Sequence, residues 1–358
     1  MKVAVILGTR PEIIKMSPII RALEKRRIDY FVLHTGQHYD YEMDGAFFRD
    51  LKLPKPEFNL GVGSGSHAEQ TSKIMVGVEK ILANEEPDIT LVEGDTNTVL
   101  GGALVAAKLH KKLGHIEAGL RSGDMRMPEE VNRIVADHVS DQLYAPTDIS
   151  YNNLLREGIS DSKVFVTGNT IVDAVRENLE YSKERFSVKD LGLSPGGYFL
   201  VTLHRAENVD SELILRGLLS SFRNLILKYG LPIVFPMHPR TTKKVEEFGL
   251  LCEGIDIIKP LGYLDFLQLE SKARLILTDS GGVQEEACCL NIPCVTLRDS
   301  TERPETVNVG ANLVVGRDLK GVLTGVEKMI GVANDWLNPY GNGASAVKII
   351  EIMRNTYG

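Results

Sequence analysis

The sequence has few cysteines, and their spacing excludes several kinds of site. The four cysteines, Cys252, Cys288, Cys289 and Cys294, form no C-x-x-C pair. A disulfide framework, a thiolate metal site and a redox pair are therefore all disfavoured. Free cysteines are commonly buried in the cores of proteins kept in a reducing compartment, so we expect packed thiols and a cytoplasmic location.

The chain also lacks long apolar runs and an excess of basic residues. No uninterrupted apolar segment approaches the roughly 18 residues that a membrane-spanning helix needs. The first apolar run, residues 3–7, ends at Gly8 and is too short for a signal peptide. The formal net charge is -7, whereas nucleic-acid modules carry clustered Lys and Arg. We expect neither a membrane nor a nucleic acid as a partner.

Familiar cofactor motifs are missing as well. The sequence contains no H-E-x-x-H and no aspartate cluster with ligand spacing, so we predict no metal site. It has no Walker loop, and Gly8-Thr9-Arg10 lacks the G-x-G-x-x-G spacing of a dinucleotide turn. These gaps argue against a kinase and a dehydrogenase, and we expect no cofactor.

Short apolar runs alternate with segments of helical spacing along the whole chain, which is typical of parallel sheets covered on both faces. A length of 358 residues suggests two domains. We predict two Rossmann-like doubly wound α/β domains of about six strands each, spanning residues 1–180 and 181–342, with a last helix at 343–358 that packs back on the first. The predicted strands are 3–7, 30–34, 88–93, 114–118, 142–145 and 163–167, then 198–203, 232–237, 255–259, 273–278, 294–298 and 311–315.

The most specific motif is Asp-Ser-Gly-Gly-Val-Gln-Glu-Glu at 279–286, between an apolar run and a helical segment. Ser280, Gly281 and Gly282 would open this helix with bare backbone N–H groups, which is a seat for phosphate. Glu286, one turn further, could reach the hydroxyls of an attached ribose. The motif therefore predicts a nucleotide site.

In the first half, charged side chains follow several predicted strands. Arg10 and Lys15 follow the first strand and could bind phosphate or carboxylate, although an ordinary solvated turn is the alternative. Asp95 and Glu117 follow neighbouring strands and could divide acid and base roles. Asp95 could instead cap a helix, and Glu117 could pair with an arginine. Glu129 opens a helix, where acids are favoured anyway.

In the second half, two histidines end strands beside arginines. His204 and Arg205 follow the strand at 198–203, and His238 follows the next strand along the chain. A lone histidine is usually structural, but this repeated placement favours a site. The loop at 301–306 would lie at the same sheet edge as Ser280, with a salt-bridged loop as the alternative. Ligands of open α/β sheets bind at this carboxyl edge.

Taken together, the motifs resemble those of the non-hydrolysing UDP-N-acetylglucosamine 2-epimerases. The resemblance spans nearly the whole chain, in order, and is carried by Gly-Thr-Arg-Pro-Glu at 8–12, Thr-Gly-Gln-His at 35–38, Gly-Asp-Thr at 94–96, His-Ile-Glu-Ala-Gly-Leu-Arg at 115–121, Pro-Glu-Glu at 128–130, Gly-Asn-Thr at 168–170, the motif at 279–286 and Thr-Glu-Arg-Pro-Glu at 301–305.

The resemblance implies two domains in the glycosyltransferase-B arrangement with the active site in the cleft that they face, a homodimer, and interconversion of UDP-GlcNAc and UDP-ManNAc for polysaccharide synthesis. The C2 hydrogen of the sugar is not next to a carbonyl, so the family eliminates UDP to give 2-acetamidoglucal and then adds it back. By motif position, Asp95, Glu117, Glu129 and His204 would share proton transfer and leaving-group stabilisation.

The same positions imply the substrate contacts. Arg10 and Lys15 would line the site near the sugar and diphosphate. The Ser280 turn would hold the diphosphate, Glu286 the ribose, and Arg205 and His238 would be additional contacts. Water must be excluded while the glycal exists.

Two departures and two alternatives accompany the resemblance. Asp40 replaces the second glutamine of a Gln-His-x-Gln stretch that binds an activating UDP-GlcNAc in bacterial members, and the segment between Asp124 and Pro128 is two residues shorter than the family pattern. A hydrolysing epimerase that releases ManNAc and UDP would share nearly all of these motifs. A glycosyltransferase of the same fold is the other alternative.

Overall fold

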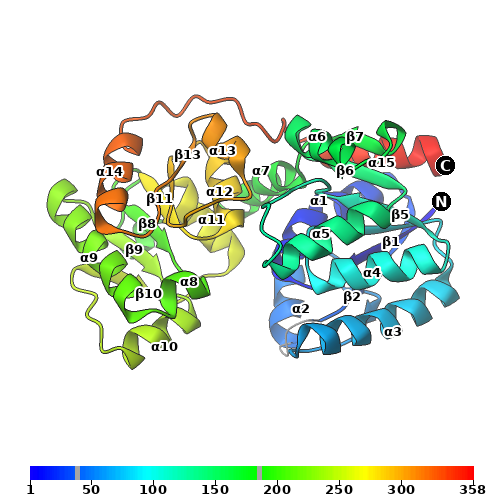
Figure 1. Ribbon diagram of the computed structural model, residues 1–358, viewed down its shortest axis with the longest axis horizontal. Coiled ribbons are helices and arrows are strands. Elements are labelled where there is room, and N and C mark those ends of the chain that lie inside the picture. The colour runs from blue at the N-terminus through cyan, green and yellow to red at the C-terminus, as the bar shows by residue number, and fades with distance from the viewer. Residues whose placement is uncertain (37–40, 184–187) are drawn as a thin grey trace. The chain divides into compact units, whose positions relative to one another are not determined.

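The computed structural model describes residues 1–36, 41–183 and 188–358. The chain divides into two compact units. The first unit comprises Met1–Glu177 and Tyr340–Gly358, and the second comprises Asn178–Pro339. The described residues confirm two parallel-sheet α/β units (Figure 1).

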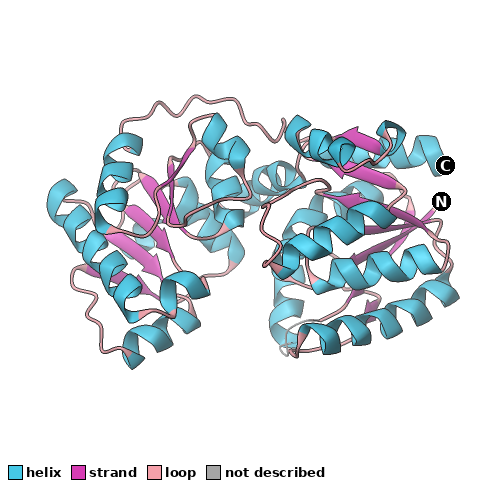
Figure 2. Cartoon of the chain, in the orientation of Figure 1, coloured by secondary structure: helices cyan, strands magenta, loops and turns pink. Residues whose placement is uncertain are grey.

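The first unit is built on a seven-stranded sheet with the order β3-β2-β1-β4-β5-β6-β7, and every neighbouring pair is parallel. Figure 2 shows helices on both faces of this sheet. The strands are β1 (Lys2–Leu7), β2 (Asp29–His34), β3 (Phe58–Asn59), β4 (Ile89–Glu93), β5 (Lys112–Ile116), β6 (Gln142–Ala145) and β7 (Val164–Val166). The helices are α1 (Arg10–Lys25), α2 (Tyr41–Asp50), α3 (His67–Glu85), α4 (Asn97–Lys108), α5 (Pro128–Val139), α6 (Asp148–Arg156), α7 (Thr170–Ser182), α15 (Ser345–Tyr357) and the short 3-10 helix η1 (Asp161–Lys163).

The second unit repeats the pattern with six parallel strands in the order β10-β9-β8-β11-β12-β13. Its strands are β8 (Phe199–Thr202), β9 (Ile233–Pro236), β10 (Ile255–Ile258), β11 (Leu275–Thr278), β12 (Cys294–Thr296) and β13 (Asn312–Val314). Its helices are α8 (Ala206–Val209), α9 (Glu212–Tyr229), α10 (Pro239–Glu247), α11 (Tyr263–Ser271), α12 (Gly281–Cys289), α13 (Pro304–Asn308), α14 (Leu319–Met329) and the 3-10 helix η2 (Val188–Leu191).

The sequence predicts about six strands for the first sheet, whereas the structure has seven, and the additional strand is β3. β3 has only two residues, and it pairs with the end of β2 through Leu33↔Phe58 and His34↔Asn59. A two-residue strand has no apolar run or alternation of its own, so sequence periodicity does not reveal it.

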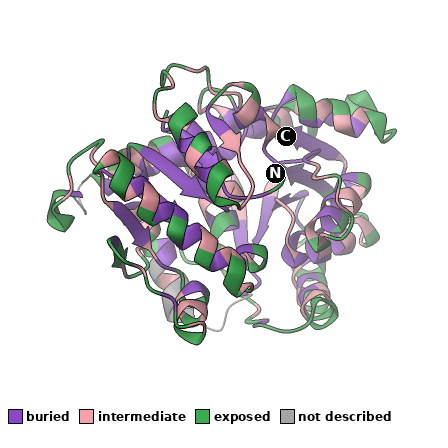
Figure 3. Ribbon diagram, turned by 60° about the vertical axis from the view of Figure 1, so that its left-hand side comes forward, coloured by how far each residue is buried: buried purple, intermediate pink, exposed green. Residues whose placement is uncertain are grey.

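Local sequence explains where the central elements begin and end. α1 starts with a capping box between Thr9 and Glu12 and has Pro11 in its first turn. α9 ends at Gly230, whose φ of +64° is the left-handed conformation that glycine adopts at low cost. Figure 3 shows the strands buried, while the helices are exposed on their outer faces.

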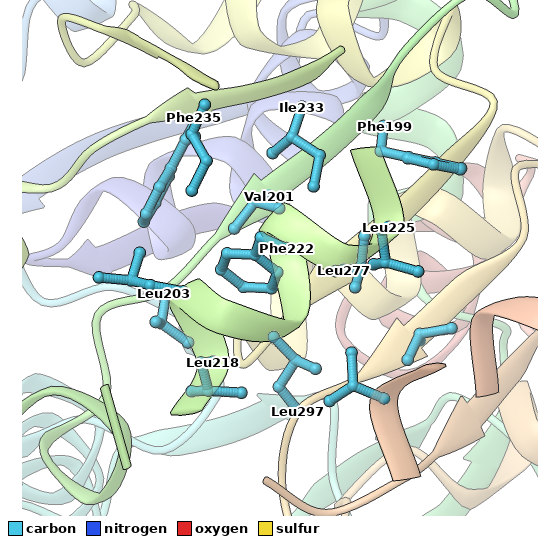
Figure 4. Close-up of a cluster of buried hydrophobic side chains, with 14 of the residues drawn as sticks. Phe199, Val201, Leu203, Leu218, Phe222, Leu225, Ile233, Phe235, Leu277 and Leu297 are labelled. Atoms are coloured by element: carbon cyan, nitrogen blue, oxygen red, sulfur yellow. The ribbon is translucent and has the colours of Figure 1, made fainter. Parts of the chain in front are cut away.

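The core of the second unit lies where α9 packs against its sheet. Phe222 of α9 is fully buried among side chains of β8 and β11, including Val201 and Leu277 (Figure 4). Burying a side chain of this size contributes on the order of 2–3 kcal/mol. This packing stabilises the sheet from whose ends the loops of the candidate site extend.

The last segment of the chain returns to the first unit, where α15 packs against α1. Before it does so, it runs along α12. The indole N–H of Trp336 donates to the Cys288 carbonyl at 3.0 Å, and the Asn338 amide lies 3.2 Å from the Cys289 sulfur. The segment before Tyr340 is thus fastened to the end of α12.

Both sheets have a point where the strand order reverses, between β1 and β4 and between β8 and β11. Connections leave to opposite faces of the sheet there, and the loops that follow the strands part to leave space for a ligand. The turns after β1, β4, β8 and β11, together with those after the neighbouring strands β5 and β9 and the start of α5, carry the residues of the candidate site.

Candidate active site

In the first unit, the turn after β1 folds around the buried carboxyl group of Glu12. This group accepts the backbone N–H of Gly8 at 2.7 Å and of Thr9 at 2.6 Å, and the Thr96 hydroxyl at 2.5 Å. Burial raises the pKa of Glu12 to about 7 in spite of these hydrogen bonds. Gly8 is required, because a Cβ there would lie 2.1 Å from the Thr35 hydroxyl. The turn is closely packed, and Glu12 acts as its internal anchor.

Lys15 of α1 joins two acids that end neighbouring strands. Its ammonium group contacts Glu117 and lies 3.6 Å from Glu93, and all three residues are buried. Asn169 donates a further hydrogen bond to Glu117 at 3.0 Å. Burial raises the pKa of Glu93 well above its usual range; Lys15 opposes this effect, and the nearby charge of Glu117 adds to it. The Lys15 ammonium group is thus shared between two carboxyl groups, and its direct contact is with Glu117.

The backbone at Glu117 is strained. Its φ is +67°, and Gly119 follows with φ of +82°. A residue with a side chain incurs a steric cost in the left-handed region, and such residues concentrate at functional sites. Glycine would relieve the strain, so the carboxylate itself accounts for glutamate at this position.

Asp95 lies after β4 and is held by α5. Arg133 donates to its carboxylate at 2.5 Å, and the Asn132 side chain donates to its backbone carbonyl at 2.8 Å. The Asp95 side chain is 26% exposed, whereas Arg133 is buried. A buried cation thus fixes the position of a carboxylate that solvent can still reach.

Two adjacent acids at the start of α5 have different environments. Glu130 is buried and accepts the backbone N–H groups of Ser122 and Gly123 as well as Arg133 at 2.6 Å. Glu129 is partly exposed, and among the described residues its carboxylate has no hydrogen-bond or ion-pair partner. Glu130 organises the loop before the helix, while Glu129 is available to a ligand.

Arg10 is the most exposed of the predicted residues in the first unit. Its guanidinium lies 5.8 Å from the centre of the Phe47 ring, in a cation–π contact. The two predicted residues after β1 therefore differ in their surroundings, because Lys15 is buried against acids and Arg10 faces outward.

In the second unit, the buried carboxylate of Asp279 organises the loop after β8. It accepts the backbone N–H of His204 at 3.0 Å, that of Arg205 at 2.9 Å, and the Asn208 amide at 3.0 Å. The His204 ring lies 3.1 Å from the same carboxylate through Nδ1. Burial alone would raise the pKa of Asp279, but these donors, His204 foremost, lower it. His204 is thus oriented with Nδ1 toward Asp279 and Nε2 free to act on a ligand.

His204 and His238 line one cavity of about 210 Å³ together with Ser280. Their ring centres are 5.8 Å apart. His238 Nδ1 accepts the backbone N–H of Arg240 at 3.2 Å, so a neutral His238 carries its proton on Nε2. Burial and then the neighbouring His204 lower the pKa of His238, which favours that neutral form.

The start of α12 borders the same cavity. The Ser280 hydroxyl caps the helix by accepting the N–H of Val283 at 3.5 Å. Neither Gly281 nor Gly282 has a positive φ, and an added Cβ would meet protein atoms no closer than 4.0 and 3.9 Å, respectively. Neither backbone conformation nor packing demands glycine at these two positions, so the backbone at this helix start can be approached closely.

Glu286 lies four residues further along α12 and is buried. It faces Tyr263 and Glu270 of α11, since burial and then the Glu286 carboxylate raise the pKa of both groups well above their usual ranges. Arg205 donates through Nε to the Asp279 carbonyl at 3.0 Å, which gives it a supporting part in the loop.

The loop at 301–306 is salt-bridged. Arg298 pairs with Glu302 through two hydrogen bonds of 2.8 and 2.9 Å, and Arg303 lies 2.6 Å from Glu285. Burial alone would raise the pKa of Glu302, but Arg298 outweighs it and lowers the value to about 2. This loop packs beside Gly281 and supports the start of α12.

The structure thus brings Lys15 and Glu117 together in the first unit, and His204, His238 and Ser280 in the second. Sequence reasoning did not single out a further set of buried polar residues that hold these groups, namely Glu12, Glu93, His115, Asp137, Asn169 and Asp279. Five of the six belong to the motifs or lie at a strand end, which could have marked them, whereas Asp137 lies near the end of α5 and carries no such signal. The Gln37–Asp40 stretch lies outside the described residues.

Within residues 1–36, 41–183 and 188–358, no group of three or more His, Cys, Asp or Glu side chains could hold a metal ion. In the same part of the chain, no helix combines the length and apolar character needed to cross a membrane.

Comparison with known proteins places these features in a family. Residues 21–354 match the family model described as UDP-N-acetylglucosamine 2-epimerase. The crystal structure of Methanocaldococcus jannaschii UDP-GlcNAc 2-epimerase in complex with UDP-GlcNAc and UDP is similar over 100% of both chains, with 54% identity and a TM-score of 0.92. A UDP-N-acetylglucosamine 2-epimerase of Methanococcus maripaludis is 53% identical, covering 98% of each chain. A UDP-2,3-diacetamido-2,3-dideoxy-D-glucuronate 2-epimerase of Pseudomonas aeruginosa is 39% identical, covering 99% of each. On these grounds the chain belongs to the UDP-N-acetylglucosamine 2-epimerase family.

Proposed function

We propose that this protein interconverts UDP-GlcNAc and UDP-ManNAc at C2 without net hydrolysis, by eliminating UDP to 2-acetamidoglucal and adding it back. Family membership supports the substrate class. The observation that carries the proposal is the open start of α12, where Gly281 and Gly282 leave bare N–H groups next to Ser280, which lines the same cavity as His204. A leaving diphosphate can be held there and returned.

In this proposal, acids of the first unit carry out the proton transfers at C2. Elimination needs a base at C2, and re-addition needs an acid on the opposite face. Asp95 and Glu117 are each fixed by a cation, and Glu129 has no partner within the described chain. We assign proton removal and return to these three. Lys15 acts through Glu117, because it is buried against that carboxylate.

The second unit would stabilise the leaving group. Ser280, Gly281 and Gly282 would bind the diphosphate at the helix N-terminus, where the dipole favours negative charge. His204 would donate to the phosphate oxygen that departs from C1, since Asp279 keeps its Nδ1 engaged. Glu286 would take the ribose hydroxyls, with His238, Arg205 and the exposed Arg10 as further contacts. The reaction requires both groups of residues to act on one substrate.

Assembly and location follow the family resemblance. We propose a homodimer that works in the cytoplasm. Sedimentation of the purified protein tests the first point, because a dimer has twice the 39.6 kDa mass of the chain.

The test is proton NMR of the purified protein with UDP-GlcNAc in deuterated buffer. We expect UDP-ManNAc with deuterium at C2 and no accumulation of free sugar. Free ManNAc with an equal amount of UDP would move the protein to the hydrolysing alternative. No change in either signal would contradict the proposal and favour a glycosyltransferase that lacks its acceptor.

The same experiment should be run with UDP-2,3-diacetamido-2,3-dideoxy-D-glucuronate, because the 39% identical relative from Pseudomonas aeruginosa is named for that sugar nucleotide. We expect UDP-GlcNAc to be the better substrate, since the relatives at 53–54% identity are named for it. A higher kcat/KM for the uronate would reassign the sugar but keep the C2 chemistry.

A further inference from the structure

A buried charged pair lies behind the turns that carry Asp95 and Glu117. His115 of β5 places Nδ1 2.7 Å from the Asp137 carboxylate of α5 and Nε2 2.9 Å from the Gly94 carbonyl. Both side chains are fully buried. A carbonyl oxygen can only accept, so Nε2 carries a proton. The carboxylate also accepts, so Nδ1 carries one too. The geometry therefore requires a buried imidazolium.

The second oxygen of Asp137 reaches the other turn. It accepts the backbone N–H of Gly119 at 3.2 Å and lies 2.7 Å from Arg121. Gly119 is two residues after Glu117, and Gly94 immediately precedes Asp95. One carboxylate thus holds the Glu117 turn directly and the Asp95 turn through His115.

These turns need such support. Gly94, Glu117 and Gly119 all have positive φ, at +86°, +67° and +82°. The backbone N–H of Gly94 also donates to the Ile116 carbonyl at 3.2 Å, which ties the two turns together directly. Burying an ion pair rarely adds stability over an apolar pair of similar volume, whereas it can specify one arrangement. The pair is better suited to fixing geometry than to stabilising the fold.

We propose that His115 and Asp137 are positioning residues, which hold Asp95 and Glu117 at a fixed separation for proton transfer. This inference rests on the proposed function. Neither residue touches the substrate; each acts through a turn. Displacement of a catalytic group by about 1 Å can cost about a hundredfold in rate.

The structural part of the inference is tested on the wild-type protein, without turnover. In NMR spectra of protein labelled with ¹⁵N-histidine, His115 should show both ring nitrogens protonated from pH 6 to 8. The direction of its pKa agrees, since Asp137 raises the value although burial alone would lower it. A neutral tautomer at pH 7 would overturn the proposal whether or not any variant folds.

The functional part uses Asp137→Asn and His115→Gln. Asparagine has one acceptor oxygen in place of two, so it cannot accept from His115 and from Gly119 and Arg121 at the same time. We expect kcat to fall about ten- to hundredfold while KM for UDP-GlcNAc stays within about threefold, because the diphosphate seat lies on the other unit. Asp141→Asn is the matched control, since Asp141 binds Lys112 and the Leu113 N–H at the opposite end of β5.

Three outcomes separate the hypotheses. A kcat of Asp137→Asn within twofold of wild type would overturn the positioning role, and so would equal losses in the Asp141→Asn control. If wild-type protein shows the imidazolium but no epimerisation, the proposed function fails while the geometry stands. If neither variant folds, the pair is required for folding itself, and positioning as its distinct role is rejected.

Discussion

The two units share a strand order around their central strands but differ in the turns at the ends of those strands. In the first unit, the turns after β1 and β4 hold Glu12 and Asp95, and the turn after the next strand, β5, carries Glu117; buried cations lie beside Asp95 and Glu117. In the second, the equivalent turns carry one buried acid, Asp279, saturated by N–H donors, and a helix start that is open above two glycines. Under the proposed function, the first set of turns would move protons and the second would hold an anion.

This difference shows that the sheet supplies rigid positions and that a few residues after each strand supply the chemistry. In the first unit, Asp95 is held by Arg133 and Glu117 by Lys15. In the second, backbone N–H groups and a helix dipole are sufficient, and they need no side-chain charge. Substitutions that change C2 epimerisation without changing UDP affinity, or the reverse, can test whether the two units divide these tasks.

The largest effect is expected for Glu117→Gln. Loss of this carboxylate should lower C2 epimerisation by about 10²–10⁴-fold, while the Kd for UDP, measured by calorimetry, stays within about threefold. Glu85→Gln is the control, because Glu85 forms a 2.8 Å pair with Lys2 that is partly exposed. A large loss of UDP affinity in Glu117→Gln would show that the two units do not divide their tasks.

Next comes the pH dependence that Glu12 of the first unit contributes to stability. The pKa of Glu12 is about 7 in the folded protein, against about 4.3 in an unfolded chain. Between these values the folded state keeps a proton that the unfolded state has released, so stability falls as pH rises, by about 4 kcal/mol at most.

Glu12→Gln should flatten this dependence, since the amide cannot ionise. Chemical unfolding at pH 5 and pH 7.5 measures it, with the exposed Glu79→Gln as control. An unchanged slope in Glu12→Gln would place the titrating group elsewhere.

The adjacent acids of α5 sharpen the contrast within the first unit. Glu129→Gln should lower kcat about a hundredfold and leave thermal unfolding unchanged, because the side chain has no partner among the described residues. Glu130→Gln should lower stability by about 1–3 kcal/mol, because it loses a charged acceptor for Arg133 and two backbone N–H groups. The reverse pattern would transfer the catalytic assignment to Glu130.

The smallest effect is expected in the second unit. Gly282→Ala should weaken UDP binding about tenfold, or about 1.4 kcal/mol, by keeping a phosphate from the backbone. Stability should hold or rise slightly, since the new methyl group would meet no protein atom within 3.9 Å. Gly217→Ala in α9 is the matched control, because a Cβ there has open space around it and Gly217 does not line the cavity of His204 and Ser280. Unaltered UDP affinity in Gly282→Ala would remove the diphosphate from this helix start.

Much of the fold could be predicted from the sequence because buried parallel strands are continuous apolar runs between turn residues. The strands from β8 to β13 fall where those runs lie. β3 was missed because it is held by its pairing with β2 rather than by a pattern of its own. Glu117 was expected just within the end of a strand, but β5 ends at Ile116 and the acid begins the left-handed turn.

The candidate site was less accessible to sequence reasoning. Residues placed directly after strands, such as Asp95, Glu117 and His204, could be singled out because strand ends meet at one edge. The buried residues that hold them in place could not be singled out in this way. Asp137 lies 22 residues from His115, near the end of a helix, and only the folded chain shows that it faces the buried imidazole. The roles of the site residues remain predictions.

The fastening of Trp336 to α12 has a practical consequence. This is the only tryptophan in the sequence, and its indole N–H donates to a carbonyl near the end of the helix whose other end is the proposed diphosphate seat. The emission of the native protein therefore reports from a single known place. Binding of a nucleotide that alters α12 should shift the fluorescence emission of Trp336. Nucleotide titrations can therefore be followed by intrinsic fluorescence, without an attached dye.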